Sequence, residues 1–329
     1  MQMIINIIRH GMIPAFLFFL TAGPALTCSN PIFQFALEQW HPDPYRVVAR
    51  GSSTWTAEQR AALRLLQDAE RSGRANLRVR LEPAATNAAA PLLEVSYADA
   101  RGIQSVVWNG TPDIGIARRL LDSPARTKIA RLLTQHKAAV WVLLESGNRR
   151  KDNAVARLLQ DELRRLESVL TTTPNPEGGM GWGGGPQQAS PPVSFGMLRV
   201  RRDDPAEAML VRMLLNIKPD LKKAGDETLA FPIYGKGLIL NALVGSAIEP
   251  QRIWAVAEFL TGPCSCVFKD AWHGASLLLN VDWGVIFKET TPPAGGAPVG
   301  AGAFLRRMEQ DEKKGVEPEP PPGKGKSKQ

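Results

Sequence analysis

The feature that most constrains the fold of this chain is an order of strands and helices that occurs twice. In the first half, a β-branched segment at 45–50 precedes an amphipathic pattern at 56–73 and an alternating apolar and charged segment at 75–82. Strand–helix–strand order predicts parallel neighbouring strands, because the helix carries the chain back across the sheet. A pair of strands about a turn at 99–102 and a helix at 124–136 complete the first unit.

The same order recurs after residue 137. The apolar periodicity and the flanking Pro and Gly residues predict each element. In chain order these are a buried strand at 138–147, a helix at 152–170, a strand at 193–204, a helix at 205–216, a hairpin at 231–245 that turns at 235–237, and a helix at 249–260. Residues 273–282 predict one last strand that pairs after the second unit.

The N-terminal segment has the layout of a secretory signal. Arg9 precedes an apolar run at 12–20, and small residues follow at 21–27, with cleavage expected after Ala25 or Thr27. The run is shorter than the ~20 residues that a membrane span needs. We therefore interpret 1–27 as a signal peptide and expect an exported protein, periplasmic or otherwise extracytoplasmic.

Cys28 follows the small-residue segment directly and leaves lipoprotein processing open as a less favoured alternative, because the preceding Ala-Leu-Thr matches poorly. Such processing at Cys28 is the one membrane association that the sequence leaves open. At the other end, residues 289–329 are rich in Pro, Gly and Lys and predict a flexible tail. The expected units between these ends are 28–137, with an N-terminal helix, and 138–288, with a C-terminal extension.

The composition limits the classes of function. The chain has 329 residues, of which 44% are hydrophobic, enough for one large or two small cores. The net charge of +8 is spread along helices and strands instead of being clustered, and no basic and aromatic module occurs. We therefore expect no nucleic-acid partner.

The order of elements resembles the thioredoxin-like fold family, over about residues 45 to 262. This resemblance implies an α/β protein of two tandem thioredoxin-like units, each a mixed sheet covered by helices. In that family a cis-proline opens the hairpin, and Pro232 in "FPIYG" and Pro91 in "PLLEVSY" stand at that point of the two units. The first unit departs from the pattern because it lacks a clear helix before its hairpin.

Both units lack the redox motif of the family. A redox-active unit carries Cys-x-x-Cys where the first strand meets its helix, because the helix N-terminus lowers the pKa of the leading thiol. The corresponding segments read "RGSSTWT" at 50–56 and "ESGNRRKD" at 145–152, and neither contains a cysteine. The resemblance therefore implies a degenerate, non-catalytic pair of units.

The three cysteines of the chain lie elsewhere, at Cys28, Cys264 and Cys266. Export favours disulfides, and three cysteines allow one bridge and one remaining thiol. Either Cys264 pairs with Cys266, or one of them pairs with Cys28. A Cys264–Cys266 bridge would be strained and easily reduced, which leaves redox exchange and soft-metal binding, with His273 nearby, as further alternatives.

No other motif predicts chemistry. The chain contains no phosphate-binding loop and no Gly-x-Ser-x-Gly elbow, and its Gly-x-Gly-x-x-Gly at 179–184 lies in a Gly-rich loop without the flanking strand and helix. We expect no cofactor, no metal site and no catalytic residue. The favoured hypothesis is an exported scaffold or interaction protein with a protein partner, part of an envelope assembly. The alternative is an extracytoplasmic thiol oxidoreductase or soft-metal handler that uses Cys264 and Cys266.

Overall fold

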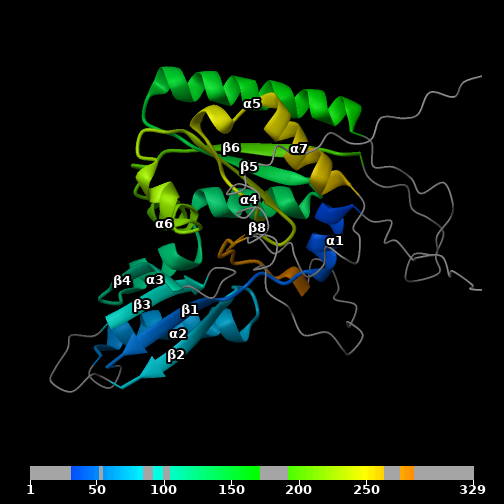
Figure 1. Cartoon of the computed structure of the whole chain (residues 1–329). Coiled ribbons are helices and arrows are strands. Elements are labelled where there is room, and N and C mark those ends of the chain that lie inside the picture. The colour runs from blue at the N-terminus through cyan, green and yellow to red at the C-terminus, as the bar shows by residue number, and fades with distance from the viewer. Residues whose placement is uncertain are drawn as a thin grey trace, which may run out of the picture.

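The computed structural model describes residues 31–51, 55–83, 92–98, 104–170, 192–262 and 275–284. These form a mixed α/β protein with two mixed sheets (Figure 1), which confirms the fold class expected from the order of elements. The helices are α1 (Ile32–Gln39), α2 (Ala57–Arg71), α3 (Ile114–Leu121), α4 (Pro124–Thr134), α5 (Arg149–Val169), α6 (Ala208–Leu215) and α7 (Pro250–Thr261).

The first sheet has four strands in the order β2-β1-β3-β4. Its strands are β1 (Tyr45–Arg50), β2 (Leu77–Glu82), β3 (Leu92–Ala98) and β4 (Gln104–Gly110). β1 runs parallel to β2 and antiparallel to β3, and β3 and β4 form an antiparallel pair. The crossover helix α2 begins with a capping box between Thr56 and Gln59, and it buries Leu63, Leu66 and Ala69, as its periodicity predicts.

The second sheet repeats this order and extends it. Its path is β6-β5-β7-β8-β10, and β9 also pairs with β7. The strands are β5 (Ala139–Leu144), β6 (Phe195–Val200), β7 (Leu229–Tyr234), β8 (Leu238–Ile239), β9 (Leu243–Val244) and β10 (Ala275–Ser276). β5 is parallel to β6 and antiparallel to β7, so β5, β6, β7 and β8 repeat the arrangement of β1, β2, β3 and β4.

Different helices cover the two faces of the second sheet. Alternate residues of the buried strand β5 enter different clusters, because successive side chains point to opposite faces. Trp141 packs in one cluster with residues of α1, α5 and α7, and Val142 packs in the other with residues of α4 and α6. Figure 1 shows α5 above the sheet and α4 below it.

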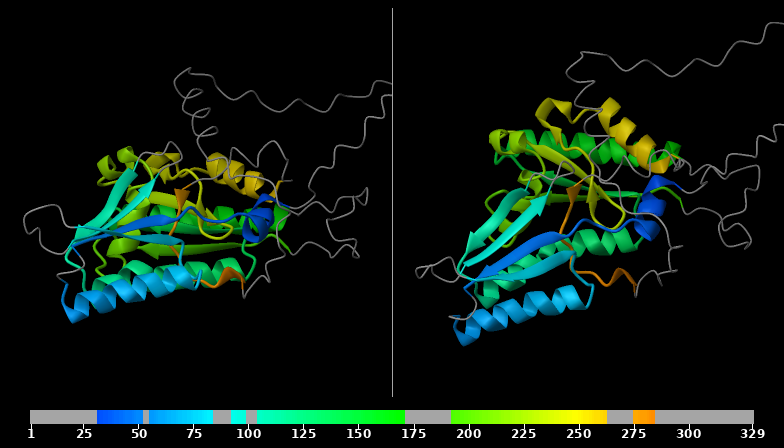
Figure 2. Two further views of the ribbon diagram at one scale, coloured as in Figure 1. Left: turned by 90° about the horizontal axis from the view of Figure 1, so that it is seen from below. Right: turned by 60° about the horizontal axis from the view of Figure 1, so that its bottom comes forward.

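Helix α4 belongs to the first unit in sequence but to the second sheet in space. Its buried residues Ile129 and Leu133 share a cluster with Val140 of β5, and the helix contacts β5 and β6. The same cluster includes Val47 of β1. One hydrophobic core therefore continues across the expected boundary between residues 137 and 138, as the two sheets lie close together in Figure 2.

Three helices differ from expectation. α5 begins at Arg149, three residues before the expected start at Asp152, because Asn148 caps it. α6 covers only Ala208–Leu215 instead of 205–216, since the chain turns before it. α3, an eight-residue helix opened by the Asp113 cap, was not expected at all. Within the described ranges, no helix combines the length and apolarity that crossing a bilayer requires.

The prediction of a cis-proline at Pro232 is wrong. All peptide bonds in the described residues are trans, and Pro232 lies inside β7, opposite Trp141 in the middle of β5. The carbonyl of Pro232 accepts a hydrogen bond from Leu240 N–H (3.1 Å). Because the nitrogen and the carbonyl of one strand residue point to the same side, the nitrogen of Pro232 also faces the side of β7 on which β8 and β9 lie. At Pro232 the pairing of β7 with β9 has ended and the pairing with β8 has not begun. A proline is tolerated there because no ladder donor is required. Pro91 lies outside the described residues.

Candidate functional site

The structure separates the residues that the sequence singled out. Cys28, Cys264 and Cys266 all lie outside the described residues, so the expected disulfide remains a prediction. Pro232 lies in mid-strand, away from the entrance of α5. At the start of β7, Leu229 pairs with Leu144 at the end of β5. The preceding residue, Thr228, contacts the start of α5 through a hydrogen bond to Asp152.

The turn from β5 into α5 is closed by one buried carboxylate. Asp152 is 1% exposed and accepts hydrogen bonds from the backbone N–H groups of Ser146 (2.8 Å) and Gly147 (3.1 Å). Its Oδ1 also accepts from the hydroxyls of Ser146 (2.9 Å) and Thr228 (2.7 Å). The Asn148 side chain takes the N–H groups of Arg150 and Lys151. Four backbone donors of this turn, which could otherwise bind an anion or stabilise a thiolate, are therefore used within the protein.

The environment of Asp152 favours its ionised form. Burial by itself raises its pKa, but the hydrogen bonds from Ser146, Thr228 and Gly147 outweigh burial and hold the pKa below its ordinary value of 3.8. Asp152 is consequently a carboxylate at neutral pH. It acts as an acceptor for four donors and holds no proton that it could give to a substrate.

The neighbouring loops close over the same junction. Arg202 donates to the carbonyls of Glu145 (2.9 Å) and Glu227 (2.6 Å). Lys151 forms an ion pair with the Glu227 carboxylate at 2.7 Å. These contacts join the end of β5, the start of α5 and the loop before β7, so the helix entrance is built as a fixed structural joint.

The corresponding junction of the first unit is filled by an aromatic side chain. Trp55 is 2% exposed, and its indole N–H donates to the carbonyl of Arg50 at the end of β1 (3.1 Å). Arg60 of α2 donates in turn to the carbonyl of Trp55. In both units, therefore, the described residues at the start of the crossover helix form hydrogen bonds with the end of the preceding strand or with the turn that follows it.

A second polar cluster lies in the core between the two sheets. Arg126 of α4 is fully buried, and its guanidinium donates to the carbonyls of Leu120 (2.7 Å), Arg119 (2.5 Å) and Leu278 (3.2 Å). Burial lowers the pKa of Arg126 to about 10, although Asp122, Tyr45 and Glu207 favour the cation. Arg126 is therefore charged at neutral pH and bonds two other chain segments, the end of α3 and the segment at Leu278.

Glu207 is the buried acid of this cluster. Its carboxylate accepts from the Ser123 hydroxyl (2.6 Å) and from the backbone N–H of Ala125 (2.7 Å). An anion at these positions satisfies the orphan donors of the α4 N-terminus and favours the helix dipole. Since Glu207 directly precedes α6, the contact fixes the start of α6 against the start of α4.

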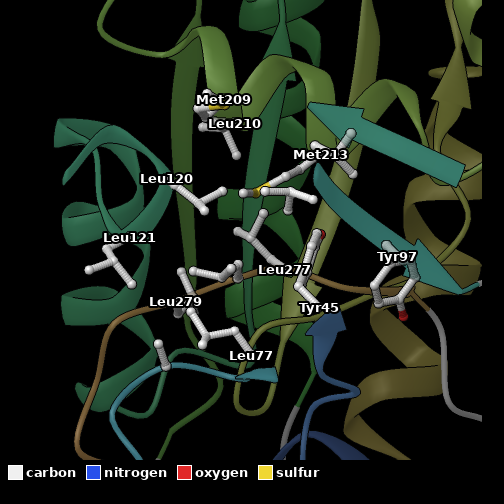
Figure 3. Packing of buried hydrophobic residues seen from close by; sticks show 14 of the residues in the cluster. Tyr45, Leu77, Tyr97, Leu120, Leu121, Met209, Leu210, Met213, Leu277 and Leu279 are labelled. Atoms are coloured by element: carbon white, nitrogen blue, oxygen red, sulfur yellow. The ribbon is translucent and has the colours of Figure 1, made fainter. Parts of the chain in front are cut away.

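Two tyrosines complete the cluster on the side of the first sheet. The rings of Tyr45 and Tyr97 lie 4.8 Å apart, and both contact Ser276 near the end of the described chain. Tyr45 donates to the carbonyl of Ser276 (2.9 Å), and the Tyr97 oxygen accepts from its N–H (2.8 Å). Burial raises the pKa of both hydroxyls, so they stay protonated at neutral pH. Figure 3 shows these rings among the leucines and methionines of the core.

Sequence reasoning missed this cluster because its members resemble ordinary helix and strand residues. Arg126 stands in an amphipathic pattern beside Lys128 and Arg131, where a solvated side chain is the usual outcome. The one available signal was Tyr45, an aromatic residue at the start of a short strand. Within the described residues, no group of three or more His, Cys, Asp or Glu side chains is placed to hold a metal ion.

Comparison of the chain with protein-family models, with curated proteins and with solved structures found no match. The proposal below therefore depends on the sequence and on the geometry of the described residues.

Proposed function

We propose that this protein is an exported, non-catalytic scaffold of two tandem thioredoxin-like units that acts by binding a protein partner. The matching strand orders of the two sheets support the proposed fold, since each has a central strand with one parallel and one antiparallel neighbour. A crossover helix joins the parallel pair in both units, as α2 joins β1 to β2 and α5 joins β5 to β6.

The observation that carries the non-catalytic role is the closed joint at Asp152. A thioredoxin-like enzyme needs free helix N-terminal donors beside a thiol. Here Asp152 and Asn148 accept four backbone N–H groups of the turn into α5, and Trp55 fills the equivalent place in the first unit. A fold that keeps its helix entrances closed is suited to presenting surfaces and not to thiol exchange.

The full chain is expected to lack dithiol-reductase activity. In an insulin-reduction assay, wild type and the Cys264→Ser, Cys266→Ser double variant should both match the rate without protein. Thiol counting before and after reduction should at the same time reveal one disulfide that involves Cys264 or Cys266. Reductase activity in the wild type that the double variant loses would instead establish the thiol oxidoreductase alternative.

Export predicts a defined mature N-terminus. Because the small-residue segment ends there, protein recovered from the extracytoplasmic fraction should begin between Leu26 and Cys28. N-terminal sequencing and intact mass measure this directly, and a mass increased by lipid at Cys28 would select the lipoprotein alternative. Recovery of exported material that retains Met1 would contradict processing.

A further inference from the structure

The C-terminal end of the described chain, residues 275–283, runs between the two sheets, where it is coloured orange in Figures 1 and 2. We call this segment the strap. Toward the second sheet, Ala275 and Ser276 pair with β8, and the N–H of Leu277 donates to the carbonyl of Gly237 (2.8 Å). Gly237 has φ +101, and a Cβ there would lie 2.8 Å from Leu279 Cδ1, so the strap and the β7–β8 turn are in close contact.

Toward the first unit, one side chain holds the backbone of the strap at two points. Asn76 Nδ2 donates to the carbonyl of Leu277 (3.3 Å), and its Oδ1 accepts from the N–H of Leu279 (3.2 Å). Further along, Val281 N–H donates to the carbonyl of Arg74 (2.6 Å), next to an isolated bridge between Ala75 and Asn280. The strap thus bonds the segment that connects α2 with β2.

The buried polar cluster of Arg126, Tyr45 and Tyr97 forms hydrogen bonds with the backbone of the strap. Tyr45 and Tyr97 hold the carbonyl and the N–H of Ser276, and Arg126 holds the carbonyl of Leu278. Leu277, Leu278 and Leu279 are all buried, and Figure 3 shows Leu277 and Leu279 near Tyr45, Leu77 and Leu120. The strap therefore contacts both sheets and α4 at once.

The ladders within the two sheets hardly involve the strap. Strands β1 to β4 pair only with one another, and β5, β6 and β7 make their pairs without β10, which adds two residues at the edge. The bonds from the first sheet to the strap come from the side chains of Tyr45 and Tyr97. Removal of the strap would consequently break only the short β8–β10 pair and leave the pairs among β1 to β4 and among β5 to β9 intact, while opening the core between the two sheets.

We propose that the strap is a separable fastening: residues 275–283 detach as one cooperative unit and release the two sheets from each other before either sheet unfolds. Cooperative opening of a contiguous segment below the free energy of global unfolding is a known property of native proteins. This device depends on the contacts of the strap and is independent of the proposed partner-binding role.

Hydrogen exchange of the full chain, followed by mass spectrometry, tests this device. Asn76→Ala removes both hydrogen bonds to the strap backbone, so exchange in a peptide spanning 275–283 should become about 10-fold faster or more. Exchange in β5 should stay as in wild type. Thr228→Val is the matched control, because it removes a buried hydrogen bond to Asp152 outside the strap, and it should leave strap exchange unchanged.

Two results would overturn the proposal. One is equal acceleration in the strap, β1 and β5, which means that the strap leaves only on global unfolding. The other is unchanged exchange in the strap of Asn76→Ala. Should that variant fail to fold, Tyr45→Phe removes one hydroxyl contact with Ser276 and keeps the ring. It should accelerate the strap selectively, and a uniform or absent effect would count against the proposal equally.

Discussion

Replacement of Arg126 with methionine is expected to lower the free energy of unfolding by about 3–5 kcal/mol, because several buried acceptors lose a charged donor at once. Methionine retains the apolar volume of the stem but leaves the carbonyls of Leu120, Arg119 and Leu278 without their donor. Urea denaturation at pH 7 gives the difference directly.

The control for this variant lies on the same helix. Arg131→Met changes an exposed arginine of α4 and should alter the free energy of unfolding by less than about 0.5 kcal/mol. Arg126→Lys keeps a cation with fewer donors, so its loss should be intermediate. Equal stabilities of Arg126→Met and Arg131→Met would show that the buried guanidinium does not hold the core together.

Asp152→Ala should lower the free energy of unfolding by about 3 kcal/mol or more, because it strands buried donors that had a charged acceptor. Ser146 and Gly147 lose the partner of their backbone N–H groups, and Thr228 loses the partner of its hydroxyl. Asp161→Ala, an exposed change on the same helix, is the control and should stay within about 0.5 kcal/mol of wild type.

The pH dependence of Asp152→Asn follows from the lowered pKa. A carboxyl group whose pKa is lower in the folded protein than in the unfolded chain adds stability above the unfolded pKa and loses it as the pH falls toward the folded one. The stability difference between wild type and Asp152→Asn should therefore be constant above about pH 5 and shrink below 3.8. A difference that stayed constant down to pH 2 would show that the charge of Asp152 is not what stabilises the joint.

Periodicity predicted the repeated strands and helices well, because each element must bury one face. It failed where short elements or long-range contacts decide. α3 was missed since its eight residues include Gly115 and carry two arginines beside its leucines. Of the expected last strand at 273–282, the structure describes 275–282, and within that part only Ala275 and Ser276 form a strand, because side chains of distant segments bond much of the remaining backbone.

The site residues show the same limit. Pro232 was expected to open a hairpin strand but lies inside β7, because its position opposite Trp141 depends on how β5 and β7 pair. Asp152 was expected to open a helix, whereas Asn148 caps α5 and Asp152 instead binds the turn before it. The residue types around an aspartate near a helix start do not show whether its carboxylate caps the helix or accepts hydrogen bonds from the turn before it.

The strap also bears on how the chain becomes a folded protein. Asp43 and Ser276, which form a hydrogen bond, are separated by 233 positions in the sequence. Since a chain is synthesised at about 5–20 residues per second, the strap follows the first sheet after an interval on the order of ten seconds or more. During that interval Tyr45, Tyr97 and the leucines around them face solvent. A nascent chain of this kind exposes apolar surface that chaperones can bind, and the exposure lasts until the strap has been synthesised and packs between the sheets.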